Sequence, residues 1–307
     1  VDGGADGGPD GGADGGLPGG ADAPPPPEAT KLPGTDVMSP RRIAYGDDPS
    51  QWGDLYRPNP GTNPGTSPDG APSKGVVVVV HGGFWKAEYD AGLGAPLALS
   101  LAENGWTALN LEYRRVGSSA GGGTGGGGGY PATFDDVAAG IDLLADVEEL
   151  TDAERATVVT LGHSAGGHLA VWAAARGRFE RWSPVRVPVT AAVSQAGVLD
   201  LTAGLADANA APNVLALMGG DAEADPAAYD AADPARHLPL GVPVRCVHGN
   251  ADTIVPLGQS RDYVAAATAA GDDATLTEVD GDHFIVIDPA TEAWSRTLEL
   301  LEALRSG

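Results

Sequence analysis

The stretch that decides the fold is TVVTLGHSAGGHLAVWAAARG, residues 157–177. It opens with a short apolar run, which is typical of a buried β-strand. It closes with a segment in which Leu169, Val171, Trp172 and Ala175 recur at helical spacing. The stretch therefore predicts a strand that turns sharply into a helix, and the turn itself has the sequence Gly-His-Ser-Ala-Gly.

The pattern Gly-x-Ser-x-Gly occurs twice in this chain, at 117–121 and at 162–166. The motif alone therefore does not identify which serine is a nucleophile. The first copy opens a glycine run and has neither a strand before it nor a helix after it. The second lies between the predicted strand and helix, where a sharp turn lifts the Ser164 hydroxyl above a sheet and the helix N-terminus favours developing negative charge. We therefore expect Ser164, rather than Ser119, to be a nucleophile. A turn that merely binds an anion is the plainer alternative.

Short Val-rich runs alternate with helical patterns along most of the chain. This alternation predicts an α/β fold with a mainly parallel sheet covered on both faces, in which ligands bind at the carboxyl ends of the strands. Residues 200–240 are rich in Ala, Asp and Pro without a strand pattern, and we expect a small cap or lid there. The expected strands are 75–83, 106–114, 156–162, 189–197, 242–250 and 274–280, and the expected helices are 95–105, 133–147, 165–177, 260–271 and 291–304.

The N-terminal residues 1–40 differ from the rest. They repeat Asp-Gly-Gly-x with a period of four and then run into four prolines, so they bury too little apolar area to offset the entropy of ordering. We expect a disordered tail over 1–40 and one folded domain over 41–307. The chain begins without a Met or an apolar leader, and export followed by processing is as compatible with it as a cytoplasmic location.

Composition excludes several classes of function. The net charge of the 307 residues is −24, with 18 basic against 42 acidic side chains, which argues against nucleic acid as a partner. The longest apolar run, Val76–Val80, has the length of a strand, so we expect a soluble protein without a membrane span.

Cysteine and metal chemistry are not expected. Cys246 is the single cysteine, so no intramolecular disulfide can form, and its apolar surroundings predict a buried, inert thiol. The histidines lack the H-E-x-x-H or H-x-H spacing of metal ligands, and the glycine insert 121–129 lacks the flanking strand and helix of a dinucleotide site. We expect no metal and no cofactor.

A nucleophilic serine needs a base and an acid that orients the base. Each should follow a strand at its carboxyl end, in the order serine, acid, histidine. Asp252, in HGNADTIVP after the strand 242–250, and His283, in GDHF after the strand 274–280, satisfy both requirements. Their plainer interpretation is a loop turn or cap. The rivals are Asp200, Asp280 and Asp282 for the acid, and His81, His163, His168, His237 and His248 for the base.

The segment VVVVVHGGFW, residues 76–85, supplies a third element. After such a strand, the backbone N–H groups of Gly83 and Phe84 would complete an oxyanion hole with that of Ala165, which follows the serine, while His81 holds the turn. The aromatic residues beside these motifs, Phe84, Trp85 and Phe284, could equally line a substrate pocket or pack against the sheet.

Together, HGGFW, GHSAGG, HGNADTIVP and GDHF resemble the α/β-hydrolase superfamily over about residues 41–305. The similarity is to the branch with an H-G-G-x-W motif, which includes kynurenine formamidase-like enzymes and small-molecule esterases. It implies a triad of Ser164, Asp252 and His283. Phe84 stands where hormone-sensitive-lipase relatives have a third glycine, which argues against a lipase-type assignment.

We therefore expect a cofactor-independent hydrolase that cleaves carboxylic esters of small substrates through an acyl-enzyme. One alternative is an arylformamidase acting on N-formyl aromatic amides, which requires the same triad. The other is a catalytically silent binding protein that retains the hydrolase fold.

Overall fold

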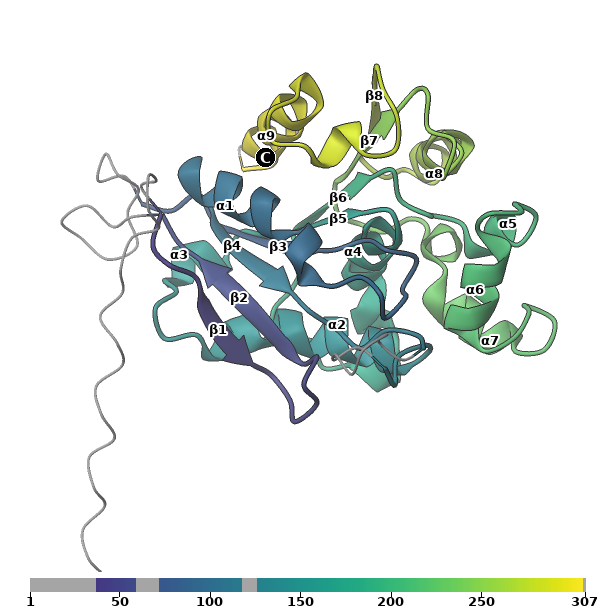
Figure 1. The fold of residues 1–307 in the computed structure, drawn as a ribbon, viewed down its shortest axis with the longest axis horizontal. Coiled ribbons are helices and arrows are strands. Elements are labelled where there is room, and N and C mark those ends of the chain that lie inside the picture. The colour runs from purple at the N-terminus through teal and green to yellow at the C-terminus, as the bar shows by residue number, and fades with distance from the viewer. Residues whose placement is uncertain (1–36, 59–71, 118–125, 306–307) are drawn as a thin grey trace, which may run out of the picture.

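The sheet has eight strands in the order β1-β2-β4-β3-β5-β6-β7-β8 (Figure 1). The computed structural model describes residues 37–58, 72–117 and 126–305. From β4 to β8 all neighbouring strands are parallel, whereas β2 is antiparallel to both β1 and β4. The strands are β1 Arg41–Ala44, β2 Trp52–Tyr56, β3 Val76–Val80, β4 Thr107–Leu111, β5 Val158–His163, β6 Ala191–Gln195, β7 Val244–Gly249 and β8 Ala274–Val279.

Helices cover both faces of this sheet, which confirms the predicted α/β class (Figure 1). The alternation along β3 sets the two faces: Val76, Val78 and Val80 pack with residues of α2 and α4. Val77 and Val79 pack with residues of α1 and α9. The helices are α1 Ala95–Glu103, α2 Ala132–Asp142, α3 Asp152–Arg155, α4 Ala165–Ala175, α5 Leu201–Gly204, α6 Ala211–Met218, α7 Pro226–Ala232, α8 Gly258–Ala269 and α9 Glu292–Leu304, with short 3₁₀ turns η1 Ala91–Leu93, η2 Leu143–Asp146, η3 Arg176–Arg178, η4 Glu180–Trp182, η5 Pro234–His237 and η6 Ile285–Ile287.

The elements differ from the sequence expectation in three respects. Most strands are shorter than predicted, because the predicted ranges include flanking residues that lie outside the paired registers; β5 instead extends one residue further, to His163. The predicted helix 133–147 is an α-helix only to Asp142 and continues as the 3₁₀ turn η2. The strands β1 and β2 have no counterpart in the prediction; β1, at the sheet edge, is four residues long and largely exposed.

The described chain begins at residue 37, slightly before residue 41. Val37 is fully buried and forms an antiparallel bridge with Pro58, so residues 37–40 of the predicted tail run along the folded domain. The remainder of that tail, the rival Ser119 and the first part of the glycine insert 121–129 lie outside the described residues.

Residues 200–240 are helical and contain α5, α6, α7 and η5. These helices gather at the end of the molecule that lies away from β1 and β2 (Figure 1). Side chains of the central helix α4 hydrogen-bond this helical segment. The His168 ring bonds the Ala232 carbonyl at 2.9 Å, and Trp172 Nε1 donates to the Ala231 carbonyl at 2.9 Å. This helical segment, where the sequence predicts a cap, is therefore attached to the helix that follows Ser164.

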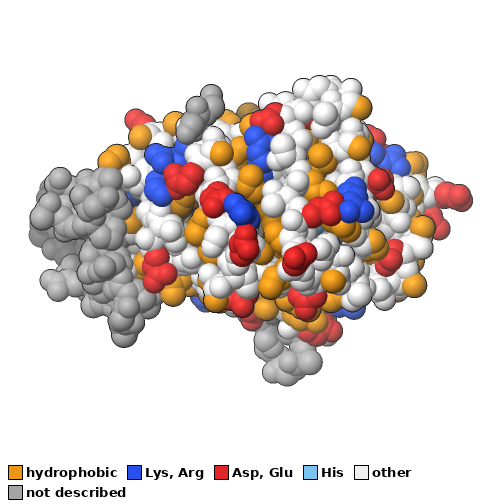
Figure 2. Space-filling view, turned by 90° about the horizontal axis from the view of Figure 1, so that it is seen from above, with side chains coloured by type: hydrophobic (Ala, Val, Ile, Leu, Met, Phe, Trp, Pro, Cys, Tyr) orange, Lys and Arg blue, Asp and Glu red, His pale blue; other side chains and the backbone are white. Residues whose placement is uncertain are grey.

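On the face seen in Figure 2, acidic and basic side chains are interspersed. Along α9, Arg296 pairs with Glu292 and Glu299, and Glu302 pairs with Lys74 and Arg305. In the described ranges, no helix is both long and apolar enough to cross a bilayer.

The buried His168 makes stability depend on pH. Burial lowers its pKa from the ordinary 6.5 to about 4, although its hydrogen bond to the Ala232 carbonyl opposes that shift. Between these two values the unfolded chain binds a proton that the folded protein does not, so stability falls as pH decreases through this window.

We predict that His168→Gln flattens this dependence, because glutamine keeps an N–H donor for Ala232 and does not titrate. The loss of unfolding free energy between pH 7 and pH 5 should be smaller by about 2 kcal/mol than in wild type, as measured by urea unfolding. The matched change at the less buried His237 should have a smaller effect. Parallel losses in wild type and His168→Gln would contradict the assignment.

Candidate active site

Ser164 lies at the turn between β5 and α4 in a strained conformation, with φ 55° and ψ −120°. A non-glycine residue adopts this region only when its surroundings enforce it. Two hydrogen bonds fix the backbone here: the Ser164 amide donates to the Gln195 carbonyl at 2.8 Å, and the His168 amide donates to the Ser164 carbonyl at 3.1 Å. The strand-to-helix turn that the sequence predicts is therefore present, with Ser164 at its apex.

Two glycines permit this turn because backbone atoms approach them closely. A Cβ on Gly162 would lie 2.1 Å from the Gly166 carbonyl oxygen, and one on Gly166 would lie 2.0 Å from the Val80 carbonyl oxygen. The start of α4 therefore sits directly against the end of β3, which carries the His-Gly-Gly turn.

Asp252 and His283 are joined by a short hydrogen bond, 2.6 Å between His283 Nδ1 and Asp252 Oδ2. The other carboxylate oxygen accepts the amides of Ile254 and Val255, at 2.8 and 2.9 Å. Burial alone would raise the pKa of Asp252, but hydrogen bonds from His248, His283 and the Val255 amide hold it well below its usual range. The carboxylate is therefore ionised, so the proton in this bond resides on His283 Nδ1; in a neutral ring, Nε2 is then an acceptor.

His163, the residue before Ser164, connects the serine turn to His283. The two rings lie 4.4 Å apart between centroids, and the distance from His163 Nε2 to the His283 carbonyl oxygen is 2.9 Å. Burial, and then the neighbouring His283, lower the pKa of His163 to about 3, so this imidazole is neutral and donates to that carbonyl. The bond places the His283 backbone beside the serine turn.

The Ser164 hydroxyl makes no hydrogen bond to another described residue, an arrangement that substrate-free enzymes often show.

The His-Gly-Gly turn lies against Ser164. A Cβ on Gly82 would be 2.8 Å from the His163 carbonyl oxygen and 3.3 Å from Ser164 Cβ. Gly83 and Phe84 follow with positive φ angles of 107° and 56°. Their amides, and that of Ala165 in the first turn of α4, donate to no other group within the described ranges, so all three N–H groups predicted from the sequence are available.

A network of buried hydrogen bonds holds this turn. His81 stacks on Tyr113 with 4.4 Å between ring centroids, and its Nε2 lies 3.2 Å from Glu112 Oε1. Glu112 also accepts the Ala91 amide, and the Tyr113 hydroxyl donates to the His81 carbonyl. The sequence predicts the role of His81, but it gives no signal for Glu112, which belongs to the end of a different strand.

The rival acids are occupied elsewhere. Asp200 caps α5, Asp280 accepts a hydrogen bond from Asn250, and Asp282 accepts the amides of Phe284 and Ile285. Among the rival histidines, His237 and His168 bond backbone carbonyls of the cap. Only Asp252, of the acids considered, bonds the His283 ring in the described part of the chain.

One rival histidine does reach the acid. His248 Nε2 lies 3.1 Å from Asp252 Oδ2, and His248 Nδ1 lies 2.8 Å from Ser260 Oγ. Neither His248 nor Ser260 is assigned to the site by the sequence prediction. The spacing of four residues between His248 and Asp252 is the signal that could have indicated the first of these contacts.

The three aromatic residues beside the motifs differ in burial. Trp85 is 1% exposed and packs edge-on against His168, so it belongs to the core. Phe284 is 54% exposed and lies edge-on to His283, with 5.3 Å between ring centroids. Phe84 is partly buried, with the Lys86 amine 5.6 Å from its ring centroid. Phe84 and Phe284 thus remain available to a ligand.

Cys246 lies in the middle of β7 and is fully buried. Burial raises the pKa of its thiol to about 12, so the predicted inert thiol is confirmed. The described residues contain no group of three or more His, Cys, Asp or Glu side chains arranged to hold a metal ion.

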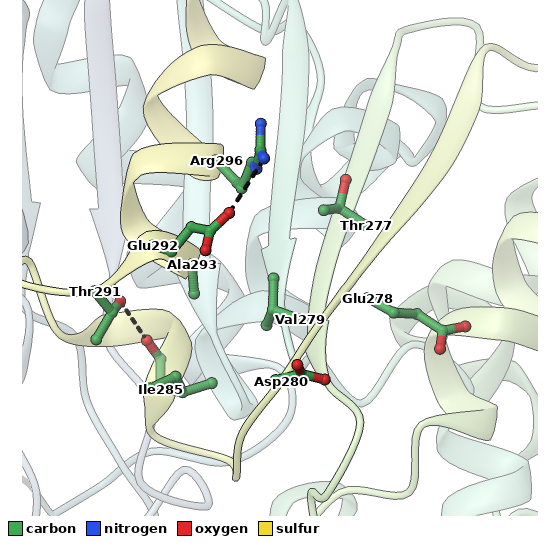
Figure 3. A pocket seen from close by; sticks show the side chains of 9 residues that line it. All are labelled: Thr277, Glu278, Val279, Asp280, Ile285, Thr291, Glu292, Ala293 and Arg296. Atoms are coloured by element: carbon green, nitrogen blue, oxygen red, sulfur yellow. Dashed lines mark hydrogen bonds and ion pairs between the residues drawn. The ribbon is translucent and has the colours of Figure 1, made fainter.

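A cleft of about 390 Å³ lies beside the site, between β8 and α9 (Figure 3). Asp280 and Ile285, on either side of His283 in sequence, line it, and the Glu292–Arg296 ion pair forms another wall. Neither Ser164 nor His283 lines this cleft, so it is separate from the reacting groups.

Several proteins of known structure share this fold. They include crystal structures of esterase B from Lactobacillus rhamnosis (TM-score 0.71, 21% identity, 88% of this chain and 87% of that one) and of the esterase Est2 from Thermogutta terrifontis (0.66, 22%, 86% and 91%). A truncated carbohydrate esterase from gut microbiota also has it (0.67, 20%, 88% and 96%). The protein therefore has the α/β-hydrolase fold, as the sequence resemblance implies.

The family model of BD-FAE matches residues 66–266, so the chain belongs to the BD-FAE family. That match includes Ser164 and Asp252 but ends before His283, whose bond to Asp252 is seen in the structure. None of the curated protein sequences matches the chain.

The close approach of α4 to β3 makes a glycine at position 166 necessary. We predict that Gly166→Ala, whose Cβ would clash with the Val80 and His81 carbonyls, destabilises the protein by about 1–3 kcal/mol or more. Gly220→Ala is the matched control, because the nearest atom to its Cβ would be a side-chain carbon at 3.7 Å. Its effect on the free energy of urea unfolding should stay within about 0.5 kcal/mol. Equal stabilities of the two variants would contradict the packing argument.

Proposed function

We propose that this protein is a serine esterase that hydrolyses carboxylic esters of small substrates through a Ser164-Asp252-His283 triad. The observation that carries the proposal is the combination of a strained Ser164 at the β5–α4 turn with the 2.6 Å bond that aligns His283 on an ionised Asp252. A serine held in this way at the end of a parallel sheet supports a role as the nucleophile.

In the first half of the reaction, His283 Nε2 takes the proton of the Ser164 hydroxyl while Oγ forms a bond to the ester carbonyl carbon. Asp252 stabilises the imidazolium through its bond to Nδ1 and stays ionised. The tetrahedral intermediate collapses when His283 gives its proton to the leaving alkoxide, and the acyl group remains on Ser164.

In the second half, His283 takes a proton from water, and the resulting hydroxide attacks the acyl carbon. Collapse of the second intermediate releases the carboxylic acid and returns the proton to Ser164 Oγ. The N–H groups of Gly83, Phe84 and Ala165 would stabilise the oxyanion in both halves, since they are available and lie on two turns in contact. This mechanism needs no metal or cofactor.

The structural neighbours support an ester substrate. Esterase B from Lactobacillus rhamnosis is described in a complex inhibited by a tributyrin phosphonate, and Est2 from Thermogutta terrifontis in a propionate-bound form. Both ligands carry short acyl chains. We infer that the present protein likewise acts on a small-molecule ester.

The helical cap 200–240 would bound the substrate site on one side. Asn209, in the cap, approaches the Thr253 carbonyl at 3.5 Å, next to the acid of the triad. From this contact we infer that the cap limits the size of the acyl or alcohol group.

Treatment with a fluorophosphonate tests the nucleophile, because the reagent labels only an activated serine. We predict one adduct by intact mass on wild type and none on Ser164→Ala, with turnover of p-nitrophenyl acetate reduced about 10⁴-fold or more. Ser119→Ala, which removes the other Gly-x-Ser-x-Gly serine, should be labelled like wild type.

The outcome of the same assay separates the alternatives. Faster turnover of a formyl-anilide than of the acetate ester would indicate an arylformamidase. Absence of both labelling and turnover in the folded wild type would overturn the proposal and favour a silent binding protein.

Removing the charge of the acid provides a second test. Asp252→Asn should lower kcat by about 10⁴-fold, because a neutral side chain no longer holds the required His283 tautomer or stabilises its imidazolium. Asp280→Asn, three residues from His283 but bonded to Asn250, should keep kcat within a few-fold of wild type. Comparable losses in both variants would argue against Asp252 as the acid.

A further inference from the structure

The acid of the triad is shared by two histidines. Asp252 Oδ2 lies 2.6 Å from His283 Nδ1 and 3.1 Å from His248 Nε2. The side chains of Asp252 and His248 are completely buried. The proposed mechanism uses His283 and leaves the second, equally buried imidazole without a role.

The hydrogen-bonding partners of His248 determine its tautomer. Its Nε2 faces two acceptors, the ionised Asp252 carboxylate and the Val255 carbonyl at 3.0 Å, neither of which can donate a proton. Nε2 must therefore carry the hydrogen. In a neutral ring Nδ1 is then an acceptor, so the Ser260 hydroxyl at 2.8 Å donates to it.

These contacts form a directed chain that ends at the acid. Ser260 on α8 donates to His248 at the end of β7, and His248 donates to both the Asp252 side chain and the Val255 carbonyl. The Val255 amide in turn donates to Asp252 Oδ1. His248 therefore holds both the Asp252 carboxylate and the turn that carries it. Because His248 belongs to β7, this support comes from the sheet and not from the turn that contains Asp252.

We propose that His248 and Ser260 are positioning residues that hold the Asp252 carboxylate toward His283, with Ser260 fixing the Nε2–H tautomer of His248. The inference rests on the proposed function, because positioning has a catalytic consequence only if Asp252 serves the triad. A purely structural His248 would contribute to stability alone.

The tautomer can be measured without any catalytic assay. In protein labelled with ¹⁵N in the histidine rings, the ring nitrogen shifts of His248, assigned by their loss in His248→Gln, should show a protonated Nε2 and an unprotonated Nδ1 at neutral pH. In Ser260→Ala this pattern should weaken or change, since Nδ1 loses its donor. A wild-type His248 that carries its proton on Nδ1, or on both nitrogens, would overturn the proposal.

Kinetics test the consequence. In His248→Met, kcat for p-nitrophenyl acetate should fall about 10- to 100-fold, the effect of losing a hydrogen bond to a charged group, with KM nearly unchanged. His248→Gln keeps an N–H donor and should recover much of the loss. Ser260→Ala should show a smaller decrease in kcat, again with KM nearly unchanged.

Two matched controls exclude a general effect of altering buried polar groups. His237 bonds a carbonyl in the cap, and Ser50 is a fully buried serine remote from the triad in sequence. His237→Gln and Ser50→Ala should retain wild-type kcat. Thermal unfolding of each variant verifies folding, and if His248→Met does not fold, His248→Gln and Ser260→Ala still carry the comparison.

The two hypotheses fail in different ways. If wild type is neither labelled by fluorophosphonate nor active, the proposed function fails, while the ring nitrogen shifts still decide the hydrogen-bond chain. If wild type is active and folded His248→Met and Ser260→Ala retain its kcat, the positioning role is wrong and the esterase proposal stands.

Discussion

The contact between the start of α4 and the end of β3 is the constraint on which the rest of the site depends. With 2.0 Å between the Gly166 Cβ position and the Val80 oxygen, the helix can begin only if that residue has no side chain. At the same turn Ser164 has a φ of 55°, at a cost of about 1–3 kcal/mol that the surrounding packing must offset. Helix α4 supplies that packing, since nearly all of its residues are buried.

The electrostatics of the site follow from burial. Asp252 remains ionised without solvent because its two oxygens accept two amides and two imidazole N–H groups. The adjacent His163 is kept neutral for the opposite reason, since burial disfavours its charged form. A negative charge is therefore held next to His283, where an imidazolium would form during the proposed reaction.

The sequence predicted elements that depend on local interactions better than elements that depend on residues far apart in the chain. The Val-rich strands and the strand-turn-helix at Ser164 were predictable, because their apolar patterns and glycines act within a few residues. The strands β1 and β2 were not, because β1 is exposed at the sheet edge and pairs only with β2, and β2 in turn pairs with β4, far along the chain. Most of residues 1–40 lie outside the described ranges, so the predicted tail stays a prediction.

The sequence by itself determined the class of fold and the order of the candidate residues Ser164, Asp252 and His283. Local propensity and the position of each residue after a strand are sufficient for that. Only the tertiary structure decided which groups meet: His163 bonds the His283 backbone across 120 residues, and Ser260 on α8 bonds His248. Such contacts form only when helices and strands pack closely enough to bring a donor and an acceptor within hydrogen-bond distance. The order of residues along the chain does not specify that geometry.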